Sequence, residues 1–183
     1  MIKKIEISTI ESCKSGKQLA QKQIFEAYSK HVFATAMRYV ADTNSAKDVV
    51  QDTFIRVFKY IKSFEGEVSG FKGWISRICI NESLKTIKKN QRFYSIEPGK
   101  EMGSYSHQKD LEMQADYIYK EIVKLPARYR TVFNLYEIEG YSHREIAETM
   151  GIKEGSSRSC LTRAKQILKE NLTVYMNNKR VSQ

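Results

Sequence analysis

Apolar residues recur every three or four positions through most of this sequence, and this period constrains the fold more than any other feature. The clearest series lies in residues 19–40, where the repeating positions are Ile24, Tyr28, Val32, Ala36 and Val40. A spacing of four places these side chains on one face of an α-helix. The chain has only two prolines, and it has no long alternating runs of β-branched residues that would indicate strands. The sequence therefore predicts an all-α fold.

Further apolar series predict helices that form two small domains. Residues 42–44 interrupt the first helix and offer a cap to the second. Residues 90–109 read NQRFYSIEPGKEMGSYSHQK, and their Pro, Gly and Ser content without an apolar period indicates a flexible linker. The predicted parts are an N-terminal tail (1–14), a helical domain (15–90), the linker (91–109), a second helical domain (110–174) and a C-terminal tail (175–183).

Lysine and arginine outnumber aspartate and glutamate by 31 to 21, so the formal net charge is +10. This excess favours a polyanionic partner, nucleic acid before a membrane surface, and the alternative is a solvated basic surface. The three cysteines lie far apart and the histidines lack metal-ligand spacing, so we expect no disulfide framework, metal or cofactor. The N-terminal segment lacks the apolar core of a signal peptide, and no apolar run reaches the length of a membrane span, so we expect a cytoplasmic protein.

The most informative local chemistry lies in residues 141–168, which read YSHREIAETMGIKEGSSRSCLTRAKQIL. Ser142 followed three residues later by Glu145 is the pattern of a capping box at the start of a helix. Gly151 permits the left-handed backbone of a sharp turn, and residues 154–157 begin a second helix. The segment therefore predicts a helix-turn-helix.

The outward face of the second of these helices is basic and rich in hydroxyl groups. Its members are Arg158, Ser159, Thr162, Arg163, Lys165 and Lys169. Arginine can reach guanine edges in the DNA major groove, and hydroxyl groups can reach bases or phosphates. The alternative is an ordinary helical hairpin with a basic exposed face.

A second polar stripe follows one side of a helix in the first domain and consists of Arg77, Asn81, Lys85 and Lys88.

Two stretches of the chain together resemble one known family. Residues 46–64 read AKDVVQDTFIRVFKYIKSF, and with residues 71–92, FKGWISRICINESLKTIKKNQR, they resemble region two of bacterial RNA polymerase sigma factors. Residues 125–165, LPARYRTVFNLYEIEGYSHREIAETMGIKEGSSRSCLTRAK, resemble region four. The chain as a whole is similar to the small extracytoplasmic-function group. The resemblance implies a protein that binds core RNA polymerase and directs promoter recognition, DNA melting and transcription initiation, and that is not an enzyme.

The resemblance also implies three functional surfaces. The surface that docks on the clamp helices of the largest polymerase subunit would consist of Asp48, Gln51, Asp52 and Ile55. The surface that captures the melted downstream promoter element would consist of Phe64, Gly66, Arg77, Asn81, Lys85 and Lys88. The surface that reads the upstream element would consist of Ser156, Ser157, Arg158, Ser159, Thr162 and Arg163. An anti-sigma factor, which in this family is frequently a membrane protein, is the further partner implied, and it would cover the same faces.

Two positions limit what the resemblance carries over. Many family members have Gly-Thr-Val-Lys-Ser-Arg where this chain has Gly-Ser-Ser-Arg-Ser-Cys at residues 155–160. Cys160 replaces a basic residue and removes a possible phosphate or base contact, so the promoter sequence does not carry over. Trp74 is the only tryptophan. We expect it to pack in the core with Ile75 and Ile78 rather than to stack on a captured base.

Two alternatives belong to other functional classes. A conventional helix-turn-helix transcription regulator would bind operators as a dimer without being a polymerase subunit, and it would carry a sensor or receiver domain where residues 1–90 are predicted to be helical. A DNA-processing enzyme would need an activated nucleophile or clustered carboxylates that hold a metal ion. Asp48 and Asp52 share one helix face, but no third acid is marked out beside them.

Overall fold

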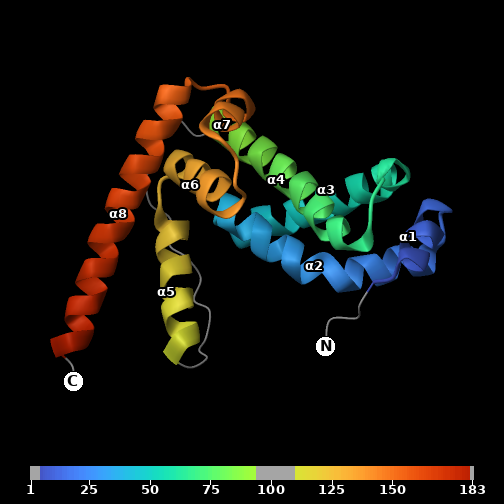
Figure 1. The fold of residues 1–183 in the computed structure, drawn as a ribbon, viewed down its shortest axis with the longest axis horizontal. Helices are drawn as coiled ribbons and strands as arrows, with labels where there is room; N and C mark the ends of the chain where they lie inside the picture. The colour runs from blue at the N-terminus through green and yellow to red at the C-terminus, as the bar shows by residue number, and fades with distance from the viewer. Residues whose placement is uncertain (1–4, 94–109, 182–183) are drawn as a thin grey trace. The chain divides into compact units, whose positions relative to one another are not determined.

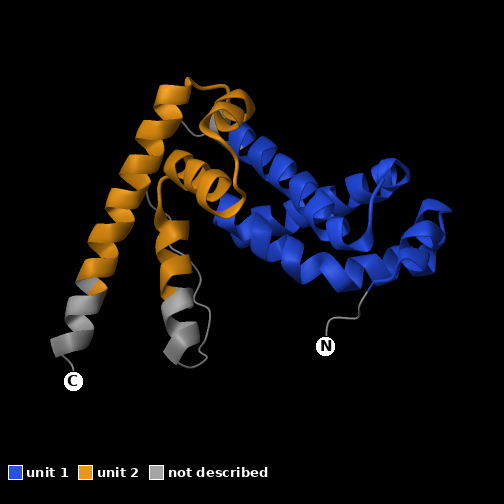
Figure 2. Ribbon diagram, viewed as in Figure 1, with its two compact units in different colours: residues 1–95 blue, residues 96–183 orange. Residues whose placement is uncertain are grey.

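The computed structural model describes residues 5–93 and 110–181, and every regular element in these two ranges is a helix (Figure 1). The all-α prediction is therefore confirmed. The chain divides into two compact units, Met1–Ser95 and Ile96–Gln183 (Figure 2). Most of the predicted linker, residues 94–109, lies outside the described residues.

The first unit is built around three long helices. Its elements are α1 (Ile7–Lys14), α2 (Gln18–Val40), α3 (Thr43–Tyr60), the short 3-10 helix η1 (Ile61–Ser63) and α4 (Val68–Phe93). Helices α2, α3 and α4 pack against one another in pairs, and their apolar stripes meet in one core. The predicted cap is confirmed, because the Asp42 carboxylate accepts a hydrogen bond from the Ser45 backbone N–H at 2.7 Å.

The predicted N-terminal tail is wrong for most of its length, because residues 7–14 form α1. Ile10 and Cys13 are buried in the core of the first unit, and α1 packs against α2 and η1. The two buried residues are three positions apart, which is one face of a helix. The charges of Glu11 and Lys14 lie between and beside them and hide this short apolar face in the sequence.

Trp74 packs into an aromatic cluster at one end of the first unit. Its ring stacks on Phe71 with the centroids 5.7 Å apart and an angle of 18° between the planes. Phe64 approaches both rings, at 4.9 Å from Phe71 and 5.4 Å from Trp74. Trp74 is half-buried against the core, so the prediction that it packs there is confirmed.

His31 gives the first unit a pH dependence that can be measured. Burial first, and then the charges of Lys72 and Arg38, lower the pKa of this histidine below its usual 6.5. Below pH 6.5 the unfolded chain therefore binds this proton while the folded chain resists it, so the free energy of unfolding falls as the pH falls. We expect a lower urea midpoint at pH 5 than at pH 7.5, followed by Trp74 fluorescence.

The variant His31→Gln retains a group that can hydrogen-bond to Ser76 Oγ, which lies 2.8 Å from His31 Nε2 in the native chain. It should reduce the difference between the two midpoints, because glutamine does not titrate. Equal differences in the variant and the native chain would contradict this assignment.

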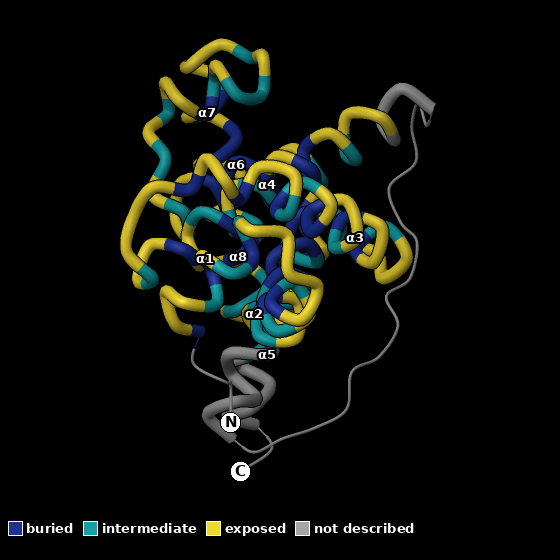
Figure 3. Tube along the Cα trace, turned by 90° about the vertical axis from the view of Figure 1, so that its right-hand side faces the viewer, coloured by how far each residue is buried: buried dark blue, intermediate teal, exposed yellow. Residues whose placement is uncertain are grey.

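The second unit has one long helix against which the others pack. Its elements are α5 (Asp110–Lys124), α6 (Ala127–Phe133), the π-helical turn η2 (Asn134–Ile138), α7 (His143–Met150) and α8 (Glu154–Val181). Helix α8 packs against α5, α6 and α7. Ile122, Leu125, Ala164 and Leu168 form the centre of the core, and Figure 3 shows buried and exposed positions alternating along the helices.

The predicted C-terminal tail is wrong as well, because α8 continues to Val181. Contacts with α5 favour the helical conformation beyond residue 168. Tyr117 and Tyr175 stack with their ring centroids 3.8 Å apart, and the Asn171 side-chain amide donates to Glu121 Oε2 at 2.7 Å. The polar composition of this segment hides contacts made with residues about fifty positions earlier.

Candidate functional site

Helices α7 and α8 form the helix-turn-helix that the sequence predicts. The Ser142 side chain accepts from the Glu145 backbone N–H, and the Glu145 carboxylate accepts from the Ser142 N–H at 2.8 Å, so the capping box is confirmed. Gly151 has φ +68°, the left-handed conformation expected at the turn. The Ile152 N–H donates to the Ala147 carbonyl at 3.0 Å and closes the corner. These local bonds place the start of α8 at a defined angle to α7.

Ser157 is a correction to the predicted upstream-element surface. Its residue exposure is 0%, and its Oγ lies 2.9 Å from His143 Nδ1. The His143 ring in turn stacks on Tyr136 with the centroids 4.4 Å apart. Ser157 therefore joins α8 to α7 and does not face solvent. Its position four residues before the buried Leu161 was the signal available in the sequence.

The remaining predicted residues of α8 reach the surface. Arg158, Ser159, Thr162 and Arg163 are exposed, and Ser156 is half-buried. Arg158 is held by an ion pair with Glu154 one turn earlier. Ser159 Oγ donates to the Gly155 carbonyl at 3.0 Å, and Thr162 Oγ1 donates to the Arg158 carbonyl at 3.1 Å. With their hydrogens used inside the helix, the two hydroxyl oxygens face outward as acceptors, which suits the amino groups of bases.

Cys160 lies on the inner side of α8, with 6% of its residue surface exposed. Comparison with the common family pattern predicts a lost phosphate or base contact at this position. Residue 160 is four positions before the buried Ala164 and shares its face, but it also lines the groove between α6 and α8, so the lost phosphate contact stays a prediction. The departure from the common pattern also affects packing at this position.

On α3, the four residues assigned to polymerase docking form one exposed stripe. Asp48, Gln51, Asp52 and Ile55 are spaced three, one and three apart and are all exposed. Ile55 keeps 57% of its surface exposed, so an apolar side chain faces solvent within this polar stripe. A groove of about 230 Å³ lies beside it, and its lining is Asp52, Ile55, Arg56, Lys59 and Glu82.

On α4, the predicted polar stripe is exposed. One of its lysines pairs with Glu82, a buried residue that the sequence did not mark out. Arg77, Asn81, Lys85 and Lys88 all reach solvent. Glu82 Oε1 accepts from Arg56 Nε of α3 at 2.6 Å and from Lys85 Nζ at 2.8 Å. Glu82 therefore joins α3 to α4 and holds one lysine of the stripe. The spacing of Glu82 and Lys85 was visible in the sequence, whereas Arg56 lies 26 residues away.

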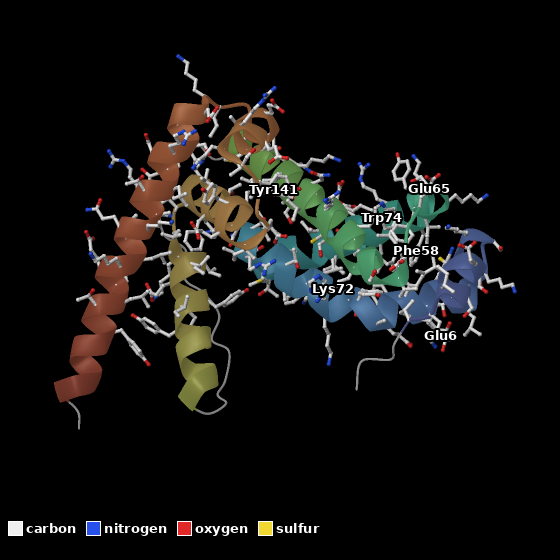
Figure 4. The ribbon with its side chains drawn as sticks, viewed as in Figure 1. Glu6, Phe58, Glu65, Lys72, Trp74 and Tyr141 are labelled. Atoms are coloured by element: carbon white, nitrogen blue, oxygen red, sulfur yellow. The ribbon has the colours of Figure 1, made fainter. Side chains whose placement is uncertain are left out.

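In the loop between η1 and α4, Phe64 is buried whereas the three residues after it are exposed. Phe64 is 5% exposed and packs on Phe71 and Trp74, so its predicted place on the DNA-binding surface is wrong. Glu65, Gly66 and Glu67 are exposed, and Figure 4 labels Glu65 in the loop and Trp74 on α4. Two carboxylates would repel phosphate, but they can accept hydrogen bonds from the amino groups of a base.

The described parts of the chain contain neither a metal-binding cluster nor a helix that could span a membrane. Within residues 5–93 and 110–181, no group of three or more His, Cys, Asp and Glu side chains is arranged to hold a metal ion. None of the helices described there combines the length and apolarity that crossing a membrane requires.

Two family models match the chain in succession. The model for Sigma-70 region 2 matches residues 24–93, and the model for Sigma-70, region 4 matches residues 115–168. The first match covers α2 to α4, with the α3 and α4 stripes, and the second covers the helix-turn-helix.

Curated relatives match over most of the chain. The ECF RNA polymerase sigma factor SigE of Mycolicibacterium smegmatis is 30% identical over 172 residues, which cover 88% of this chain and 66% of that protein. The ECF RNA polymerase sigma-E factor of Haemophilus influenzae is 28% identical over 181 residues, which cover 91% of this chain and 95% of that protein. The ECF RNA polymerase sigma factor SigW of Bacillus subtilis is 29% identical, and the match covers 94% of this chain and 97% of that protein.

One solved structure is similar in fold and sequence. It is the sigma factor RpoE in complex with the anti-sigma factor NepR from Bartonella quintana. The TM-score is 0.54 at 26% sequence identity, and the match covers 84% of this chain and 96% of that one.

Proposed function

Because this chain belongs to the extracytoplasmic-function group of RNA polymerase sigma factors, we propose that it directs core RNA polymerase to promoters through three exposed helical surfaces. It acts as a dissociable subunit that supplies promoter recognition and assists melting, and the catalysis of RNA synthesis belongs to the core enzyme. It works in the cytoplasm, where the polymerase and the promoter DNA are.

The observation that carries the proposal is the arrangement of α7 and α8. A capped support helix and a Gly turn orient a second helix whose exposed side presents Arg158, Thr162 and Arg163. Such a helix fits the DNA major groove, where arginine reads guanine and hydroxyl groups meet base edges. The same chain carries the region 2 match, which a conventional operator-binding regulator or a recombinase does not require.

The α3 stripe is our proposed contact with the clamp helices of the polymerase. An exposed isoleucine surrounded by polar groups has the composition of an interface centre, where apolar burial supplies affinity and a polar rim supplies specificity. The stripe consists of Asp48, Gln51, Asp52 and Ile55, and all four side chains are accessible. The groove beside Ile55 would receive a side chain of the partner helix.

The α4 stripe and the loop before it are our proposed contact with the melted downstream element. Exposed Arg77, Lys85 and Lys88 suit phosphates of a single strand, and Asn81 suits a base edge. The acidic loop around Gly66 suits a base that has left the stack, since its carboxylates repel the backbone. Phe64 contributes by packing beneath this loop.

An anti-sigma factor is the further proposed partner. It would cover the α3 stripe and the exposed face of α8 and so block both polymerase and DNA. The support is that a relative of similar fold, RpoE of Bartonella quintana, was solved in complex with the anti-sigma factor NepR.

Run-off transcription with purified core polymerase tests the proposed function. The promoter is obtained by sequencing the transcripts that appear when the chain is overproduced. We expect a run-off product that depends on both the chain and the core enzyme. DNA binding as a dimer without any effect on polymerase would instead favour the operator-binding regulator.

The α3 contact has its own test in the variant Ile55→Ala. Truncation of an apolar residue at an interface centre should weaken binding to core polymerase by about tenfold, and stability should change little because the side chain is exposed. The matched control is Ile7→Ala, another exposed isoleucine of the same unit. Binding is measured by fluorescence anisotropy of the labelled chain against core enzyme. Equal affinities of the two variants would refute this contact.

A further inference from the structure

A groove between α6 and the first turns of α8 brings residues of α6, which have no role in the assignments above, next to the predicted DNA-binding face. Its volume is about 390 Å³. Its lining comes from Arg128 and Tyr129 of α6 and from Gly155, Ser156, Ser159, Cys160 and Arg163 of α8. A water molecule occupies about 30 Å³ in the liquid, so the groove admits a group several times that size. Within the second unit, the groove lies directly beside the exposed face of α8.

The spacing of residues on α8 separates the groove from the rest of the exposed face. Ser156, Ser159 and Arg163 are three and four positions apart, so they form one edge of the helix, next to α6. Arg158, Thr162 and Lys165 form the opposite edge by the same spacing. The two arginines of the groove therefore come from different helices, although they are 35 residues apart in the sequence.

The charge of the groove is strongly positive. Arg128 and Arg163 are both exposed, and no aspartate or glutamate is among the lining residues. By contrast, Arg158 is paired with Glu154, and Lys165 is paired with Glu137 at 2.7 Å. Two guanidinium groups with adjacent hydroxyl groups are suited to an oxyanion, because planar forks of N–H donors match phosphate oxygens in pairs.

We propose that this groove binds a phosphate group of the DNA backbone next to the bases read by α8, with Arg128 as the principal ligand from outside the helix-turn-helix. The proposal rests on the proposed function, because a helix in the major groove is flanked by backbone phosphates. A phosphate held between α6 and α8 would set the depth and register of α8 on the duplex. Ser156 lines the same edge and would add a hydroxyl contact.

The groove's chemistry favours a phosphate over a base. Direct base reading needs side chains on the outermost line of α8, whereas the groove lies to one side of that line, toward α6. A stacked base would need an exposed aromatic face, but Tyr129 is half-buried against the core of the unit. The groove should therefore bind DNA of any sequence.

The test is a salt titration of the full-length chain, without polymerase, against a fluorescent mixed-sequence duplex of about 30 base pairs, a length near three turns. One phosphate contact contributes about 0.9 to the slope of log K against log salt concentration. We expect Arg128→Gln to weaken binding by about tenfold at low salt and to lower the slope by about 0.9, equally on any sequence. We expect Arg128→Lys to keep the slope, because it keeps the charge.

The control variant is Lys120→Gln, which removes an exposed charge of the same unit from α5. An equal fall in slope for Lys120→Gln and Arg128→Gln would show a general charge effect and overturn the proposal. An unchanged slope in Arg128→Gln, or no binding of the native chain at low salt, would also overturn it. A thermal shift of the native chain by inorganic phosphate at matched ionic strength, lost in Arg128→Gln while duplex binding is unchanged, would assign the groove to a free anion instead.

This test separates the groove from the function on which it rests. The duplex measurement uses no polymerase and no promoter, whereas the proposed function is tested by run-off transcription. A native chain that supports run-off but shows no effect of Arg128→Gln on the slope would disprove the groove alone. A chain that binds the duplex through Arg128 but fails in run-off would disprove the polymerase-directing function alone.

Discussion

Replacing Arg158 and Arg163 together by glutamine is expected to lower run-off transcription from the chain's promoter by about a hundredfold or more. A bidentate contact between Arg158 and guanine contributes about 1–3 kcal/mol of discrimination, and Arg163 adds a phosphate contact, so the loss of both contacts leaves little specific binding. Both side chains are exposed, and Arg158 pairs only with Glu154 on its own helix among the described contacts, so the fold should be retained. Binding to core polymerase should stay unchanged, because the proposed contact lies on α3 of the other unit.

The control for that experiment removes the same charge elsewhere. Lys22→Gln combined with Lys120→Gln takes one exposed lysine from each unit and leaves the proposed surfaces intact. We expect full run-off activity from this double variant. If both double variants lost activity equally, net charge rather than the α8 face would explain the result. If the arginine variant lost polymerase binding without unfolding, the division of roles between α3 and α8 would be wrong.

The variant Arg130→Met should lower the free energy of unfolding of the second unit by about 2–4 kcal/mol. Arg130 is 6% exposed, and its Nη1 donates to the carbonyl oxygens of Val123 at 2.6 Å and Leu125 at 2.9 Å. Burial lowers the pKa of Arg130 to about 10, which still leaves the guanidinium charged at pH 7. The side chain satisfies carbonyl groups at the end of α5 that would otherwise lose water without gaining a partner.

Amide hydrogen exchange in α6 and α8 at pH 7 measures this effect in the unit concerned. The matched control is Arg128→Met, an exposed arginine two positions earlier on the same helix. That substitution should change the free energy of unfolding by less than about 0.5 kcal/mol. Equal exchange rates in the two variants would show that the buried hydrogen bonds of Arg130 contribute nothing particular to stability.

The secondary structure and the helix-turn-helix were predictable because they depend on neighbours in the sequence. The apolar period that marks α2, the Asp42 cap of α3, the capping box at Ser142 and the turn at Gly151 each involve residues within a few positions of one another. A helix forms its hydrogen bonds within the segment, so such signals survive without knowledge of the fold. The exposed stripes on α3 and α4 followed from the same period.

The errors arose where a residue's surroundings come from another helix or loop. Phe64 has the chemistry of a base contact, but it packs on Phe71 and Trp74 of the next helix. The residue type of Ser157 gives no hydrophobic signal. Its spacing of four residues from the buried Leu161 was the signal that could have excluded it from the surface. The short helix α1 was hidden for the opposite reason, since charged residues surround its two buried positions.

By itself, the sequence determined that this protein is helical, where most of the helices apart from α1 and the end of α8 lie, where the helix-turn-helix lies and which stripes of α3, α4 and α8 are polar. Only the tertiary structure decided which members of those stripes reach solvent, how Glu82 joins α3 to α4 through Arg56, and that Arg128 and Arg163 line one groove. The physical reason is the range of the interactions. Helical periodicity and capping act over three or four residues, whereas burial, ion pairing across helices and groove formation depend on which helices meet.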